Sequence, residues 1–68
     1  MTELDTRIMS ALAQANALTV PEICRDADSA REATQRALHT LDDAGHVILR
    51  NGFYRLSEAA RAARRASA

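Results

Sequence analysis

The sequence VILRNGFYRL, residues 47–56, decides how this chain of 68 residues folds. Asn51-Gly52 stands between two short runs rich in large residues, which is the strongest short-range signal for a two-residue β-hairpin. In a type I′ turn centred on these two residues, Arg50 pairs with Phe53 and the register continues outward to both strand ends. An isolated hairpin is only marginally stable in water, so this one is expected to pack on the rest of the chain.

The two faces of this hairpin are expected to differ, because side chains alternate between the faces of a strand. The inner face, which would lie on the helices, is predicted to carry Val47, Leu49, Tyr54 and Leu56. The outer face is predicted to carry Ile48, Arg50, Phe53 and Arg55. Exposed apolar residues are common, yet two of them beside two arginines favour a contact surface. Ile48 and Phe53 are therefore the predicted protein-interaction residues.

Helices are predicted on the N-terminal side of the hairpin, where apolar residues recur at helical spacing. A first helix is expected to begin at Thr2, with Asp5 completing a capping box. A second helix, of about residues 20–27, is expected to begin at Thr19, with Glu22 in the same role.

The longest predicted helix covers residues 29–45. Ser29 and Glu32 fit a third capping box, and Gly45 is expected to end the helix. The apolar stripe of this helix is predicted to be Thr34, Ala37, Leu38, Leu41 and Ala44.

The C-terminal residues are rich in alanine and arginine. Ser57 is expected to cap a last helix, which is predicted to fray after about residue 62 because few large residues hold it. The whole chain is thus predicted to be mainly α with a small β-hairpin. It divides into a domain of residues 1–58 and an Ala/Arg-rich helix or tail of residues 59–68.

Several chemical functions are not expected from this set of residues. The single cysteine, Cys24, allows no internal disulfide, and with His39 and His46 it makes no spacing of the zinc type. No Ser/His/Asp or Cys/His set and no glycine-rich phosphate loop is apparent, so neither an enzyme nor a cofactor is expected. With no second domain to house a pocket, no small-molecule ligand is expected either.

The N-terminal residues MTELDTRIMS are acidic and lack the basic region and apolar core of a signal peptide. No apolar run approaches the roughly 20 residues needed to span a bilayer. The expectation is a soluble, cytoplasmic protein without membrane contact.

Charge is unevenly divided along the chain, although the net charge is zero. Residues 1–28 hold two arginines against five acidic residues, a net charge of −3, while residues 29–68 hold seven against four, a net charge of +3. This asymmetry favours contact with a polyanion through the C-terminal half. All nine basic residues are arginine, whose planar fork suits phosphates and base edges. A GC-rich genome would produce the same bias.

Three motifs in this order resemble a known family. They are Leu18-Thr-Val-Pro-Glu-Ile23, Ala37-Leu-His-Thr-Leu-Asp-Asp-Ala-Gly45 and Tyr54-Arg-Leu56. Together they resemble the winged helix-turn-helix of small bacterial regulators such as the IclR and MarR types, over residues 4–58. The resemblance implies a three-helix bundle followed by the hairpin as a wing.

The resemblance also implies that residues 29–45 are a recognition helix, whose N-terminal half enters the DNA major groove. By position, base contacts would come from Arg31, Gln35, Arg36 and His39. Arginine offers a fork to guanine and glutamine an amide pair to adenine. Thr19 would hold a phosphate at the start of the second helix, and Arg50 and Arg55 would reach the backbone or the minor groove. Glu32 is either the capping partner of Ser29 or a cytosine contact.

Two functions remain in competition at this point. The first is a small DNA-binding protein, a transcriptional regulator or phage-type factor that binds double-stranded DNA, with a homodimer preferred because two-fold binders suit palindromic sites. The second is a protein-interaction winged helix, such as a small phage or mobile-element inhibitor of a host protein or nucleoprotein complex. The zero net charge favours the second, because phosphate neutralisation supplies most non-specific DNA affinity. A dimer would use the small residues Ala11, Ala15, Ala59, Ala60 and Ala63.

Overall fold

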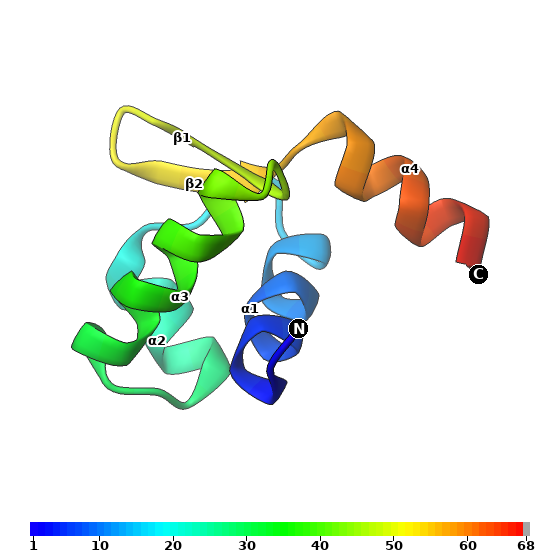
Figure 1. The fold of residues 1–68 in the computed structure, drawn as a ribbon. Helices are drawn as coiled ribbons and strands as arrows, with labels where there is room; N and C mark the ends of the chain where they lie inside the picture. Colours follow the sequence, from blue (N-terminus) through cyan, green and yellow to red (C-terminus); the bar gives the residue numbers. More distant parts are fainter. Residues whose placement is uncertain (68) are drawn as a thin grey trace.

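Three helices enclose the core and a hairpin closes one end of it (Figure 1). The computed structural model describes residues 1–67. The elements are α1 Glu3–Ala13, α2 Val20–Ala27, α3 Arg31–Asp43, β1 Val47–Arg50, β2 Phe53–Leu56 and α4 Glu58–Ser67. The fold is therefore mainly helical with one small antiparallel hairpin, as the sequence predicts.

Local hydrogen bonds explain where the first two helices begin. At α1 the Asp5 N–H donates to Thr2 Oγ1 and the Thr2 N–H donates to Asp5 Oδ2, both at 3.1 Å, which confirms the predicted capping box. At α2 the Thr19 N–H and hydroxyl both donate to Glu22 Oε1, at 2.8 and 3.0 Å. These bonds satisfy donors that a helix start leaves without an intrahelical partner.

The stability that the start of α2 contributes depends on pH through the Glu22 carboxylate. The backbone N–H of Thr19, and then its hydroxyl, hold the pKa of Glu22 below its ordinary value of 4.5. A group with a lowered pKa in the folded state stabilises that state above its unfolded pKa, and the contribution is lost as pH falls through the folded pKa. We expect Glu22→Gln to remove part of the acid sensitivity of the unfolding free energy below about pH 4.5. Urea titrations across this range measure it, with Glu58→Gln, an exposed first-turn carboxylate of α4, as the control. Equal pH dependence in the two variants would contradict the expectation.

The third helix is shorter at both ends than the predicted range of 29–45. Ala30 occupies the N-cap without a side-chain hydrogen bond, so the predicted capping role of Ser29 is wrong. Ser29 instead belongs to the end of α2: its N–H donates to Cys24 O at 3.0 Å, and the Asp28 N–H donates to Arg25 O at 3.3 Å. With Asp28 left-handed at φ 52°, these are the two bonds of a Schellman ending. The turn between α2 and α3 therefore leaves Ser29 unable to cap the next helix.

The C-terminal end of α3 has the same kind of ending. The Gly45 N–H donates to Asp42 O and the His46 N–H donates to Leu41 O, with Gly45 at φ +81°. Gly45 therefore stops the helix as predicted. The helix itself ends at Asp43, so Ala44 lies beyond it. Ala44 is exposed and does not belong to the apolar stripe, contrary to the prediction. The other four members of the stripe are buried: Thr34, Ala37, Leu38 and Leu41.

The hairpin has the predicted register, with Arg50 opposite Phe53 and Val47 opposite Leu56. Asn51 and Gly52 both have positive φ, 51° and 82°, as a type I′ turn requires. The pattern of burial differs from strict alternation, because Leu49 is 48 % exposed although the sequence places it on the inner face. Ile48, expected outside, is half-buried. Leu49 lies close to the turn, where the wing extends beyond the helices (Figure 1).

A third extended segment joins the hairpin. Leu18, in the loop before α2, forms an antiparallel bridge with Tyr54: its N–H donates to Tyr54 O at 2.9 Å, and the Tyr54 N–H donates to Leu18 O at 2.7 Å. This bridge fastens the wing to the loop between α1 and α2, and no local sequence pattern indicates it. The core that results is made of apolar residues from every element, among them Ile8, Leu12, Ile23, Leu38, Leu41, Val47 and Leu56.

The last helix is attached through its first turn. The Ala60 N–H donates to Ser57 Oγ at 3.1 Å, so Ser57 caps α4 as predicted. Among the described residues of α4 only Ala60 is buried. The helix extends to Ser67, past residue 62 where fraying is predicted, and its alanines and arginines are strong helix formers. Ala68, the end of the predicted tail, lies outside the described residues.

Candidate nucleic-acid interface

The outer face of α3 brings together the residues expected to contact bases. Arg31, Gln35, Arg36 and His39 are all exposed, and residues four apart on a helix are surface neighbours. Gln35, Arg36 and His39 line one shallow hollow, which they share with Glu32 and Thr40. This exposed face of α3, called the ridge below, thus carries a guanidinium fork, an amide and an imidazole, which are groups that can hydrogen-bond to base edges in a major groove.

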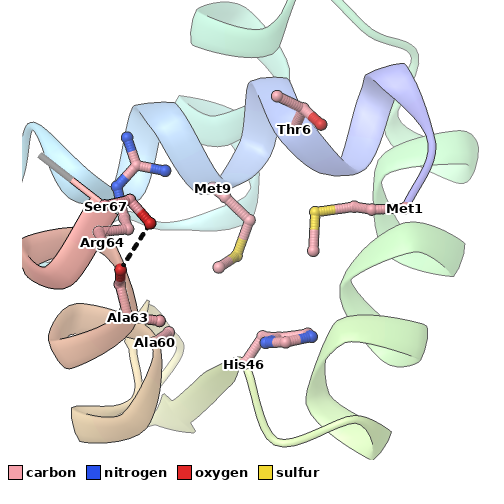
Figure 2. Close-up of a pocket in the computed structure, with 8 residues that line it drawn as sticks. All are labelled: Met1, Thr6, Met9, His46, Ala60, Ala63, Arg64 and Ser67. Carbon is pink, nitrogen blue, oxygen red and sulfur yellow. Dashed lines mark hydrogen bonds between the residues drawn. The ribbon is translucent and has the colours of Figure 1, made fainter.

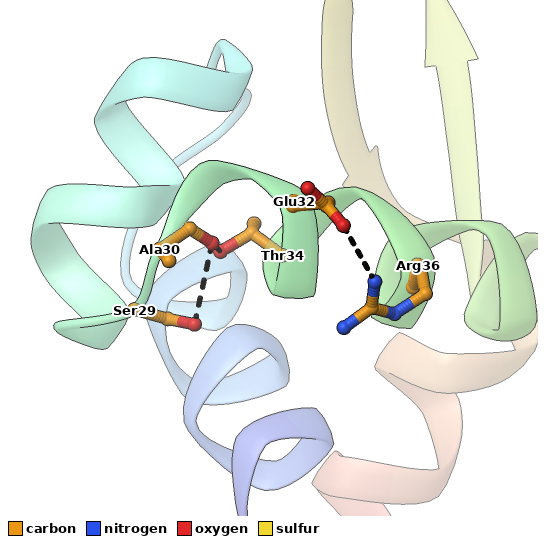
Figure 3. A network of polar contacts seen from close by, with 5 residues as sticks. All are labelled: Ser29, Ala30, Glu32, Thr34 and Arg36. Atoms are coloured by element: carbon orange, nitrogen blue, oxygen red, sulfur yellow. Dashed lines mark hydrogen bonds and ion pairs between the residues drawn. The ribbon is translucent and has the colours of Figure 1, made fainter.

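Acidic partners balance two of these side chains. Arg36 Nη1 lies 3.1 Å from Glu32 Oε1, and the two side chains are 71 % and 87 % exposed (Figure 3). His39 Nε2 lies 3.5 Å from Asp43 Oδ2 at the other end of the ridge. An exposed ion pair such as Arg36–Glu32 contributes about 0–1 kcal/mol, so a phosphate or a base can replace Glu32 at Arg36 at little cost. Glu32 is thus part of the ridge, not the capping partner of Ser29.

The wing supplies a second basic surface. Arg50 and Arg55 are exposed, and the hairpin, residues 47–56, contains no acidic residue. Phe53, opposite Arg50, is 46 % exposed. The wing therefore combines positive charge with one aromatic ring at its outer end.

Thr19 occupies a different environment from the other candidates. Both of its donors already bind the Glu22 carboxylate. A phosphate at this helix start would have to compete with that carboxylate, so Thr19 is a weaker candidate than the arginines.

A separate hollow lies between α1 and α4, away from the outer face of α3. The side chains of Met1 and Met9 reach into it toward His46 (Figure 2). Its rim on α4 is formed by Ala60, Ala63, Arg64 and Ser67. Local periodicity does not reveal this hollow, because it arises where two helices distant in the sequence diverge.

Two kinds of feature are absent from residues 1–67. No group of three or more His, Cys, Asp or Glu side chains is placed to hold a metal ion. Within the same residues, no helix has the length and apolarity required to cross a bilayer.

Solved structures share this fold closely, although no protein-family model and no curated protein matches the chain significantly. Ligand-free NadR superposes with a TM-score of 0.88 at 24 % identity, over 97 % of this chain and 51 % of that one. A MarR family protein of Mycobacterium tuberculosis gives 0.84 at 29 % identity, over 98 % and 52 %. A MarR family transcriptional regulator of Silicibacter pomeroyi DSS-3 gives 0.86 at 16 % identity, over 97 % and 51 %. This chain thus spans about half the length of each structure, and it is a winged helix-turn-helix domain with the fold of MarR family regulators.

Proposed function

We propose that this chain is the DNA-reading domain of a transcriptional regulator. In this proposal α3 lies in the major groove, and the wing lies on the adjacent backbone or minor groove. The observation that carries it is the exposed ridge of Arg31, Gln35, Arg36 and His39 on the third helix of this fold. The fold shared with the MarR family regulators supports the same assignment.

Arg31 and Arg36 are assigned different roles on the ridge. Arg31 is exposed at the first residue of α3 and makes no ion pair within residues 1–67, so it is free to meet a phosphate or a guanine. Arg36 lies five residues further along and is already oriented by Glu32. The wing arginines, Arg50 and Arg55, would add phosphate contacts, which position the domain without specifying sequence.

The test is duplex binding by the purified chain, followed by fluorescence anisotropy. Arg31→Ala and Arg36→Ala are each expected to weaken specific binding by about 5- to 150-fold, because each removes a bidentate or phosphate contact. Arg7→Ala is the matched control, since Arg7 is exposed on α1 and lines a different hollow. Affinity should also fall steeply between about 50 and 200 mM salt. Equal affinities for all three variants would contradict the proposal.

A homodimer is part of the proposal, because one small module buries only about 600–1,000 Å² on DNA. The exposed Ala59 and Ala63 on α4 are available for such a contact. Ala60, proposed from the sequence for the same purpose, is buried within its own chain and is not available. Two-fold symmetry would then match a palindromic site.

The competing function is a protein contact through the wing. Phe53, exposed beside Arg50 and Arg55, favours it, because aromatic and arginine residues are the usual anchors of interfaces. The dependence of DNA affinity on salt concentration distinguishes the two functions. Tight DNA binding with a steep salt slope supports the regulator, whereas no binding at low salt directs attention to Phe53 and a protein partner.

A further inference from the structure

Glu32 is an acidic side chain on a surface expected to face a polyanion. It is 87 % exposed, it pairs with Arg36 at 3.1 Å, and it lines the same hollow as Gln35 and His39. A carboxylate there repels phosphates, and it meets mostly acceptor atoms along a major groove. On DNA, its presence would lower the affinity of the ridge in general.

No capping role accounts for this carboxylate. The N-cap of α3 is Ala30, without a side-chain hydrogen bond, and the Ser29 hydroxyl lies 3.5 Å from Ala30 O instead (Figure 3). The first turn is instead secured by the buried Thr34, whose hydroxyl donates to Ala30 O at 2.9 Å. A negative charge in a first turn is favourable, but that effect does not require contact with Arg36.

We propose that Glu32 is a specificity-determining residue. This proposal rests on the proposed DNA-reading function. With Arg36 held beside it, Glu32 accepts a hydrogen bond from a cytosine N4 amine while Arg36 donates to a guanine. Where no amine faces Glu32, the carboxylate is desolvated against acceptors without compensation. Glu32 therefore lowers the affinity for other sequences as well as contacting a base of the preferred sequence.

The experiment compares Glu32→Gln with Asp43→Asn, the matched removal of the other paired carboxylate on α3. Duplexes are selected by the unaltered chain from a library randomised over about two helical turns. Affinities are then measured for the selected duplex, its single-base variants and the random pool, at one salt concentration. Thermal unfolding of both variants confirms that they are folded.

Glu32→Gln is expected to bind the random pool more tightly and to lose discrimination at one cytosine position by about 5- to 150-fold. Asp43→Asn is expected to change all affinities by one common factor. A uniform gain for Glu32→Gln would overturn this inference while leaving DNA binding intact, because it would show only a general charge effect. Absence of any duplex binding by the unaltered chain would overturn the proposed function and this inference with it.

Discussion

Replacing Leu38 by alanine is expected to lower the free energy of unfolding by about 3–4 kcal/mol. Leu38 is fully buried at the centre of α3, in the core shared by the helices and the hairpin. Truncation loses the free energy gained by transferring the leucine side chain from water into the core. It also leaves a cavity that the surrounding helices close only in part. Because the free energy of unfolding is roughly 0.05–0.15 kcal/mol per residue, a domain of this size has a total of only about 3–10 kcal/mol. The variant should therefore lose between about a third and all of the domain's stability.

Leu49→Ala is the matched control, because it makes the same chemical change at a residue that is 48 % exposed. Its cost should stay below about 1 kcal/mol, in line with the smaller area it buries. Urea unfolding followed by circular dichroism measures both values. Similar losses in the two variants would mean that the packing described for α3 is incorrect.

Leu18→Pro should be at least as damaging as Leu38→Ala, at about 3–5 kcal/mol. Proline removes the N–H that donates to Tyr54 O at 2.9 Å, and the change also removes a core side chain that is 9 % exposed. Leu18→Ala removes the side chain but keeps the N–H. The difference between the two variants therefore reports on the hydrogen bond from the Leu18 N–H to Tyr54 O.

The carbonyl of Tyr54 is left without its partner in the proline variant, which costs about 1–3 kcal/mol where water does not reach it. Chemical denaturation gives both stabilities, and hydrogen exchange at the Tyr54 amide reports directly on the bridge. If Leu18→Pro and Leu18→Ala unfold at the same denaturant concentration, the hydrogen bond from the Leu18 N–H to Tyr54 O contributes no stability.

Elements defined by local chemistry could be predicted from the sequence. The Asn51-Gly52 turn sets the hairpin register, because a type I′ turn leaves only one pairing of the flanking residues. Thr2 with Asp5 likewise defines the start of α1 within a few residues of chain. Features that depend on distant parts of the chain were missed. The Leu18 bridge is a single residue with no periodicity, and the exposure of Leu49 depends on how far the helices extend beneath the wing.

Competition between neighbouring elements explains the error at Ser29. A serine followed three residues later by a glutamate is typical of a capping box, but the same residue also completes the end of α2. At the candidate interface, the helical spacing of Arg31, Gln35 and His39 was sufficient to place them on one exposed face. Glu32 and Arg36 are also four residues apart, so helical spacing allows their pairing to be predicted. Assigning Glu32 to a cap with Ser29 obscured this pairing.

The attachment of α4 has a mechanical consequence. Its ten residues form a rod about 15 Å long, which is fixed to the body mainly at Ser57 and Ala60. A tilt of about 10° at that fixed end would displace the far end by roughly 2–3 Å over this length. The Ser57 N–H donates to His46 O at 2.9 Å, so the pivot lies at the base of the wing. Because this attachment adjoins the base of the hairpin, a change in the tilt of the wing would be amplified along α4 and would shift Arg64 and Arg65 most.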